Sequence, residues 1–358
     1  MERKGFLTAL AITLAGATMA QAPDLNKLRA EIQLKKYRYT VGDTGLLSKD
    51  MKQLTGDLLP ANIAQIARAQ EPIAKRILDI DKDAREAAVR RNPSLRGKIY
   101  EFNIIANPGM KRWDWRTQGK VSPIRNQNPA GTCWAFSVVG ALESALRVRN
   151  GTTIDGSEQY VVSYSGAGNT GGGDRTKAND FLQSRGTTSE AVTPYNATNS
   201  TPTPASTATP YELLTWGLVD ANNALPSVAA IKAALCEHGP LEIGIYADSN
   251  LKSYNGGVFD HVDSGNSASN HAILLVGWDD DKGAWIVKNS WGTGWGETCG
   301  YGSEKGYGYI KYGTHNVCWR AMWVKAKSVL YTINPDLLKA ILSNPGVIKL
   351  NPPKLIPN

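Results

Sequence analysis

Cys133 is the residue whose position in this chain best suits nucleophilic chemistry. It follows a turn-rich run that includes Pro129 and Gly131, and an apolar pattern of helical spacing begins directly after it. The unpaired N–H groups and the dipole at a helix N-terminus favour negative charge, so a thiol placed there ionises more readily. The position predicts a thiolate nucleophile. A buried structural cysteine is the alternative for such a residue taken alone.

His271 and Asn289 are the residues that could activate this thiol. His271 stands at the mouth of an apolar strand predicted over residues 272–278, and Asn289 follows a strand predicted over residues 284–288. An acidic turn joins the two strands, so we expect a hairpin that brings Asn289 close to His271. The asparagine carbonyl would hold one ring nitrogen while the other faces the thiol. Trp291 is expected to cover this pair and exclude water.

The remaining pattern places these residues on a mixed scaffold of helices and strands. The helix after Cys133 should end near Gly151, and a second helix should begin at Ser157. Residues 23–107 read instead as a charged helical segment with few aromatics. Asp24 is predicted to cap its first helix, and three prolines are predicted to break the later helical pattern: Pro60, Pro72 and Pro93. Other predicted elements are helices over 178–184, 228–236 and from Pro335, and strands over 241–246, 307–312 and 321–326.

The first 22 residues resemble an export signal. A short charged start precedes an apolar run over residues 6–20, which is too short and too rich in small residues to be a good membrane span. We expect cleavage after Ala20 and a soluble protein that is secreted or periplasmic, with a membrane anchor as the alternative. Asn196 and Asn199 fit the pattern of N-glycosylation acceptors in a low-complexity loop.

Composition argues against several other classes of function. The formal net charge is +8, but Lys and Arg are scattered without interleaved aromatics, so no nucleic-acid surface is expected. The acidic turn at residues 279–283 lacks the spacing of a calcium loop, and the chain has no Cys-x-x-Cys pair, so we expect no metal and no cofactor. If Cys133 is free, three cysteines remain, and one disulfide with one free thiol is the simplest account.

The run from Gln127 to the helix after Cys133 resembles the active-site run of the papain family of cysteine peptidases. In that family His and Asn follow the cysteine by about 130–150 residues, and His271 falls within this spacing while Asn289 falls slightly beyond it. Residues 289–297, Asn-Ser-Trp-Gly-Thr-Gly-Trp-Gly-Glu, are a particularly specific match. The segments at 157–159 and 172–173 also match, and the resemblance covers about residues 110–325.

The resemblance implies an α+β, papain-like fold with two lobes and a cleft between them. A helical lobe would carry Cys133, and a β-barrel-like lobe would carry His271 and Asn289, with Gln127 holding the oxyanion. It implies a secreted cysteine endopeptidase that hydrolyses polypeptides through a thioester, is inhibited by its own pro-segment, and is a monomer without a membrane anchor. Substrate contacts are expected at Gly172, Gly173, Asn270, Ala272 and Trp291. The division is residues 1–22 signal peptide, 23–107 helical pro-segment, 108–326 peptidase domain and 327–358 C-terminal extension.

The chain also departs from the family pattern. Ala130 replaces a cysteine of the active-site run, and the disulfides that the family usually has in the helical lobe are missing. Cys318 resembles a family cysteine whose usual partner is absent, so we predict Cys299–Cys318 with Cys236 buried and free, although all three pairings stay open. The pro-region lacks the family's interspersed Glu/Arg/Phe/Asn pattern, so a permanent accessory domain is its alternative.

Substrate preference is the least visible property of the sequence. Ala272, with Met322 or Trp323, is expected to line the pocket for the second residue before the cleaved bond, which should then favour apolar side chains. Two other classes of function compete with peptide hydrolysis. One is an acyl transferase that uses the same three residues, and the other is a non-catalytic papain-like binding protein.

Overall fold

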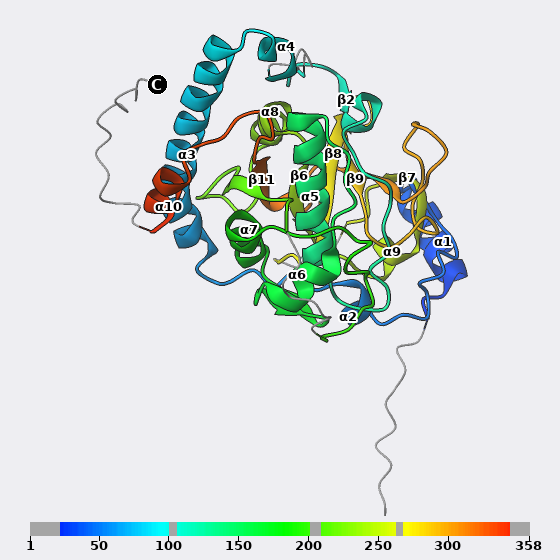
Figure 1. Ribbon diagram of the computed structural model, residues 1–358. Coiled ribbons are helices and arrows are strands. Elements are labelled where there is room, and N and C mark those ends of the chain that lie inside the picture. The colour runs from blue at the N-terminus through cyan, green and yellow to red at the C-terminus, as the bar shows by residue number, and fades with distance from the viewer. Residues whose placement is uncertain (1–21, 100–105, 201–208, 263–267, 344–358) are drawn as a thin grey trace, which may run out of the picture.

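The computed structural model describes residues 22–99, 106–200, 209–262 and 268–343 (Figure 1). The export signal predicted for residues 1–22, with its cleavage point after Ala20, falls almost entirely outside these ranges. The last part of the predicted C-terminal extension, residues 344–358, is also outside them. None of the helices in the described ranges is long and apolar enough to cross a bilayer.

Helix α5, Cys133–Asn150, occupies the middle of the molecule (Figure 1). Its side chains are buried along nearly the whole length because it packs on strands β8 (His271–Asp279) and β11 (Trp319–Ala326) and on helix α7 (Arg175–Ser184). Gly151 ends the helix with a φ of 64°, a left-handed conformation that glycine adopts without strain. The predicted start and end of this helix are therefore confirmed.

The strands form one large mixed sheet in the order β1-β7-β10-β9-β8-β6-β11-β5, with β2 added beside β8. This path does not close on itself in the part of the chain that the structure describes, so the expected β-barrel-like lobe is an open sheet. The bounds are β1 Tyr39–Val41, β2 Arg112–Asp114, β5 Leu213–Leu218, β6 Leu241–Ile245, β7 Tyr254–Phe259, β8 His271–Asp279, β9 Ala284–Lys288, β10 Tyr307–Lys311 and β11 Trp319–Ala326. A separate small ribbon joins β3 Gly168–Asn169 to β4 Gly172–Gly173.

Strand β8 divides the two hydrophobic cores. Ile273 and Leu275 point into the core shared with β6 and β7, while Leu274 and Val276 point into the core around α5. Successive side chains of a strand face opposite sides, so a strand buried on both faces reads as one continuous apolar run. This explains why the sequence of β8 shows no alternation.

The shorter helices begin at residues whose side chains cap them. Ser157, Asp174, Ser227 and Asp248 each accept a hydrogen bond from a backbone N–H of the first turn that follows. The helices are α6 Glu158–Tyr164, α7 Arg175–Ser184, α8 Val228–His238 and α9 Ser249–Ser253, with the 3-10 helix η1 at Trp115–Gln118.

The predicted pro-segment wraps around the peptidase domain. Helix α1, Leu25–Lys35, is capped by Asp24 as predicted, and β1 then pairs with β7 at the sheet edge. Helix α2, Met51–Leu54, is followed by an extended stretch and by the long helix α3, Ile63–Arg91. Helices α1 and α3 lie on opposite sides of the molecule (Figure 1), and a short helix α4, Leu95–Ile99, follows.

The prediction that Pro72 breaks this segment is wrong. Helix α3 runs through Pro72 without interruption. A proline inside a helix costs about 3 kcal/mol, so tertiary packing must offset it. The buried face of α3 supplies that packing against β5, and Ile77 lies in a small core with Leu214 and Ile341 of helix α10, Pro335–Ser343.

Candidate active site

The structure places Cys133 at the first position of α5, with no part of its side chain exposed. Its Sγ accepts a hydrogen bond from the backbone N–H of Ala272 at 3.4 Å. Ala272 is the second residue of β8 and follows His271 directly. The helix and the central strand of the sheet are therefore in contact at the thiol.

His271 and Asn289 face one another across the pair β8–β9. The His271 Nε2 lies 2.9 Å from the Asn289 Oδ1, and that oxygen also accepts the backbone N–H of Ser290 at 2.8 Å. The indole of Trp291 stacks on the imidazole at 4.6 Å between ring centroids. The other ring nitrogen, Nδ1, is buried and has no hydrogen-bond partner, so it is the nitrogen left for the thiol.

Gln127 is fully buried and its amide is held at both ends. The Oε1 accepts a hydrogen bond from the Ser290 hydroxyl at 2.7 Å, and the Nε2 donates to the Ala130 carbonyl at 2.9 Å. The same Nε2 donates at 3.2 Å to the carbonyl of Leu54, a residue of the predicted pro-segment. The Trp291 indole N–H donates to that same carbonyl at 3.0 Å. A backbone carbonyl of the pro-segment therefore occupies the donors of this site.

The next residues of the pro-segment pair with the residues predicted to bind substrate. The N–H groups of Gly56 and Asp57 both donate to the Asn270 carbonyl, at 2.8 and 3.0 Å. Gly173 donates to the Gly56 carbonyl and accepts from the Leu58 N–H, each at 2.9 Å, in a parallel bridge. The approach is close, because a Cβ on Gly56 would lie 2.2 Å from the Gly131 carbonyl oxygen. Gly173 and Asn270 therefore hold an extended peptide in this structure.

Burial decides the protonation of Cys133 and His271 in this closed arrangement. Desolvation raises the pKa of the Cys133 thiol far above its usual value, and the Asp57 carboxylate adds to this. Desolvation lowers the pKa of His271 to about 4, although the hydrogen bond to Asn289 acts in the opposite direction. In the covered site, burial therefore opposes the acidic thiol that the sequence predicts. A helix dipole contributes only about 0.3–1 kcal/mol, which burial outweighs.

Comparison with known proteins identifies the family. Residues 110–327 match the sequence profile described as papain family cysteine protease. The chain belongs to the papain family. Cathepsin K of Gallus gallus is 34% identical over 212 residues, which are 57% of this chain and 60% of that protein. Fruit bromelain of Ananas comosus is 34% identical over 201 residues, 55% of each chain. The match thus spans about 60% or less of these two relatives' length.

Solved structures show the same fold. Digestive procathepsin L2 from the larval midgut of Tenebrio molitor aligns with a TM-score of 0.64 at 24% identity, over 84% of this chain and 88% of that one. Bromelain of Ananas comosus in complex with the E64 inhibitor aligns with a TM-score of 0.52 at 28% identity, over 60% of this chain and 99% of that one. The precursor therefore covers more of this chain than the shorter bromelain does, and the papain-like fold is confirmed.

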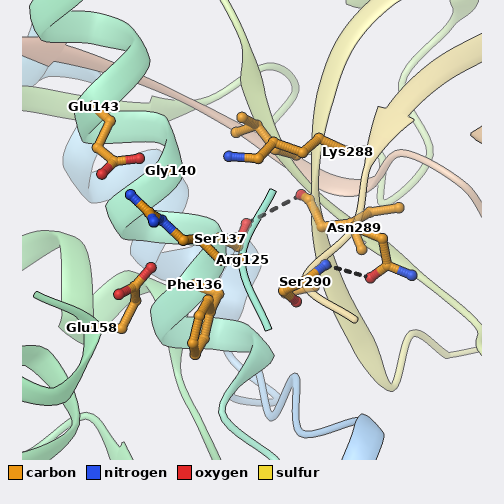
Figure 2. A pocket seen from close by; sticks show the side chains of 12 residues that line it. Arg125, Phe136, Ser137, Gly140, Glu143, Glu158, Lys288, Asn289 and Ser290 are labelled. Atoms are coloured by element: carbon orange, nitrogen blue, oxygen red, sulfur yellow. Dashed lines mark hydrogen bonds between the residues drawn. The ribbon is translucent and has the colours of Figure 1, made fainter. Parts of the chain in front are cut away.

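A small charged cavity lies behind the His271–Asn289 pair of this papain-family site. Its volume is about 20 Å³, room for roughly one water molecule. Figure 2 shows Glu143 and Glu158 on one side and Lys288 on the other, beside Asn289 and Ser290. Burial raises the pKa of Glu158 well above its usual value and lowers that of Lys288 to about 8. The sequence analysis did not predict this buried charge next to the asparagine.

The predicted disulfide Cys299–Cys318 is wrong, because all four cysteines are free in the structure. Cys299 lies in the core around α5, while Cys318 lies in the core on the other face of β8, so the two thiols face different cores. Cys236 is free as expected but only half-buried. In place of a disulfide near Ala130, the Tyr195 hydroxyl lies 2.7 Å from the Thr132 hydroxyl and donates to the Gln127 carbonyl, also at 2.7 Å.

A second cluster of possible ligands lies away from the cleft. Atoms of Asp248, His261 and His315 lie within 4.8 Å of one another. Local hydrogen bonds account for Asp248, whose carboxylate caps α9 and lies 3.3 Å from the His315 Nε2. The capping of α9 and the contact with His315 are therefore sufficient to explain the position of the Asp248 carboxylate.

The pocket beside Gly173 differs from the apolar one expected from the sequence. Trp323 stacks on His238 at 4.3 Å between ring centroids and lines a groove against α3, outside the cleft. Met322 is buried beside Asn179. The side chain of Asp57, which pairs with Gly173, instead faces Arg175, and Arg175 lies beside Glu242; both of these side chains are fully buried. The sequence analysis missed Arg175. Its position shortly after Gly172 and Gly173 indicated that it lies near the substrate, but its partners Asp57 and Glu242 lie far away along the chain.

Proposed function

We propose that this chain is the precursor of a cysteine endopeptidase that acts through Cys133, His271 and Asn289. In this assignment Cys133 is the nucleophile and His271 is the general base and acid. Asn289 orients the imidazole through the 2.9 Å contact at Nε2. Gln127 and the Cys133 backbone N–H stabilise the oxyanion.

The observation that supports this proposal best is the hydrogen bond that the Gln127 Nε2 donates to the Leu54 carbonyl oxygen at 3.2 Å. A substrate's carbonyl oxygen must meet such a donor when the thiol attacks. The amide is fixed by the Ser290 hydroxyl at 2.7 Å, so the donor is oriented before substrate arrives. Preorganised donors need no rearrangement during the reaction, which is the basis of their contribution.

The bond changes follow from these positions. In the processed enzyme His271 holds the Cys133 proton as an imidazolium, the thiolate sulfur attacks the peptide carbonyl carbon, and the resulting oxyanion lies on Gln127. The C–N bond then breaks as His271 gives its proton to the leaving amine, which leaves a thioester. Water loses a proton to His271 and attacks the thioester, the acid is released, and the sulfur leaves as a thiolate beside the His271 imidazolium.

The pro-segment is proposed to be an intramolecular inhibitor that is removed on activation. Leu54 blocks the oxyanion donors, and Gly56 and Leu58 take the backbone positions at Gly173 and Asn270. Substrate cannot enter while these bonds persist. Mass spectrometry of the active enzyme tests this proposal, because an active form that retains residue 30 would contradict it.

Covalent labelling tests the catalytic assignment directly. After processing, the wild-type protein should form one adduct with a thiol-directed epoxide, located on Cys133. The Cys133→Ala variant should form none, and it should not hydrolyse peptides. Absence of an adduct on processed wild-type protein would refute the peptidase assignment.

Export is proposed from the sequence of residues 1–22 and has its own test. The protein should be recovered outside the cytoplasm with an N-terminus that begins after Ala20 or Ala22. Recovery of an intact N-terminus from the cytoplasm would contradict it. We also propose a monomer, which light scattering of the purified precursor can test.

A further inference from the structure

We propose that the pocket occupied by Asp57 selects an acidic side chain, so that the processed protease prefers Asp or Glu as the second residue before the cleaved bond. This inference rests on the proposed peptidase function and names its substrate class. Arg175 would be the residue that determines the preference.

The first argument is the position of Asp57 in the pro-segment. Its neighbours Gly56 and Leu58 form the backbone bonds to Gly173, so its side chain projects from the strand that occupies the substrate's place. Whether a peptide pairs with Gly173 in the parallel or the antiparallel direction, the side chain of its residue opposite Gly173 lies on the same face of the paired strands. Its neighbours along the peptide lie on the other face, because side chains alternate along a strand. A substrate side chain at this position therefore enters the same pocket.

The second argument is the recognition of the carboxylate. The Arg175 Nε donates to one carboxylate oxygen of Asp57 at 2.9 Å, and its Nη2 donates to the other at 3.2 Å. The Ser269 hydroxyl donates a third hydrogen bond at 3.0 Å. This two-pronged geometry matches carboxylates specifically, and an arginine keeps its charge when buried.

The third argument is that Arg175 is fixed and unexposed. It is the first residue of α7, directly after the cap Asp174, and its side chain is fully buried. Removal of the pro-segment takes Asp57 away and leaves the Nε and Nη2 edge without its partner. A buried charge that has lost its partner favours any ligand that restores it.

The shape of the pocket fits a carboxylate as well. Gly244 of β6 forms part of the wall, and a Cβ there would lie 2.5 Å from the Ser269 hydroxyl oxygen and 3.1 Å from the Asp57 Oδ2. A larger residue at this position would displace both the hydroxyl and the carboxylate. The glycine therefore leaves the space in which the acid is bound.

Two groups near Arg175 oppose this preference: Glu242, and the Cys133 thiol when it is ionised. The Glu242 carboxylate lies 3.9 Å from the Arg175 Nη1 and accepts hydrogen bonds from the Asn179 amide at 3.0 and 3.2 Å. It faces a different nitrogen of the guanidinium from those that Asp57 uses. Burial raises the pKa of Glu242 to about 7 in the precursor, a rise to which the Asp57 charge also contributes. Because Glu242 faces Nη1, the Nε and Nη2 edge of Arg175 remains available to a second carboxylate.

The experiment compares isosteric peptides on the processed wild-type enzyme. Fluorogenic substrates that carry Asp or Asn, Glu or Gln, and Leu at the second position before the cleaved bond are assayed for kcat/KM. We expect the acids to exceed their amides by ~10- to 100-fold, the range of a hydrogen-bonded charge. Equal values, or a preference for Leu, in an enzyme that is labelled by the epoxide would overturn this inference alone. Absence of all cleavage and labelling would overturn the proposed function instead.

Two variants test the assignment to Arg175. Arg175→Met should bring the acid-to-amide ratio close to one, whereas Glu242→Gln should keep or increase it. A ratio that persists in Arg175→Met, or that disappears in Glu242→Gln, contradicts the assignment. If Arg175→Met does not fold, the wild-type peptide pairs and Glu242→Gln still decide the question.

Discussion

At the scale of single residues, the site depends on atoms that are held before substrate arrives. Gln127 receives the Ser290 hydroxyl on its oxygen, which aims its nitrogen at the Leu54 carbonyl. Asn289 shares one oxygen between His271 and the backbone of Ser290. Ser290 therefore supports both the proposed oxyanion donor and the orienting asparagine. The sequence analysis included Ser290 in the matching run 289–297 but predicted no role for its side chain.

Removal of the Gln127 donor should slow the chemical step. In the processed enzyme, Gln127→Glu keeps the size of the side chain and replaces the N–H donor with an acceptor. We expect kcat to fall by ~10²–10³-fold with a smaller change in KM, as for loss of an oxyanion donor. Steady-state kinetics with one peptide measure this. An unchanged kcat would contradict the role of Gln127, and retained epoxide labelling would show that the fold is intact.

The thiol should become more reactive when the pro-segment leaves. In the precursor the raised pKa of Cys133 keeps the thiol protonated well above neutral pH. The lowered pKa of His271 keeps the imidazole neutral above about pH 4. From about pH 5 to pH 8 the pair is therefore neutral. We expect alkylation by iodoacetamide to be more than ~10-fold slower in the precursor than in the processed enzyme, because only the thiolate reacts.

The pH profile of alkylation is the control for this interpretation. The processed enzyme should react rapidly at pH 5.5, and the His271→Ala form, processed by added wild-type enzyme, should lose that low-pH reactivity. Equal rates for precursor and processed protein across this range would show that the pro-segment does not control ionisation.

At the scale of elements, the stretch between α2 and α3 adds one buried ion pair to the backbone hydrogen bonds that join the pro-segment to the cleft. Both side chains of the Asp57–Arg175 pair are almost completely unexposed. Removal of one partner from such a pair is strongly destabilising, because the other charge stays buried without compensation.

The Asp57→Asn change should therefore weaken the precursor. In a Cys133→Ala background, which prevents self-processing, we expect the free energy of unfolding to fall by about 3 kcal/mol. Urea unfolding measures this, with Asp83→Asn on the exposed side of α3 as the matched control at within about 0.5 kcal/mol. In the presence of Arg175→Met the effect of Asp57→Asn should shrink. Equal effects in both backgrounds would show that the two side chains are not coupled.

Much of this element structure was predictable, and what was not has a physical reason. Helix α5 and the β8–β9 hairpin were predictable because periodicity, a terminal glycine and a turn act over short distances. Strands β1 and β7 were missed because β1 has only three residues and β7 contains two adjacent glycines, so neither shows a clear alternating pattern. The helical path through Pro72 and the Asp57–Arg175 pair depend on partners far along the chain, which a single sequence does not reveal.

At the scale of the whole molecule, the described part of the predicted C-terminal extension, residues 327–343, packs against the pro-segment. Helices α3 and α10 lie side by side at one edge (Figure 1), and Ile77, Leu214 and Ile341 form a small core between them and β5. A segment that follows the peptidase domain thus covers a segment that precedes it. If α3 departs with the pro-segment on activation, this core loses Ile77 and keeps Leu214 and Ile341.

The Ile341→Ala change should reveal whether α3 departs. In the Cys133→Ala precursor we expect it to lower the free energy of unfolding by about 2–5 kcal/mol, because a fully buried side chain is removed. Leu342→Ala on the same helix is the matched control, since that side chain is 38% exposed and should matter much less. In processed protein, the loss of Ile77 would leave Ile341 partly uncovered, so its substitution should have a smaller effect. An equally large effect in both forms would mean that α3 stays bound after processing, as a permanent accessory element rather than a removable inhibitor.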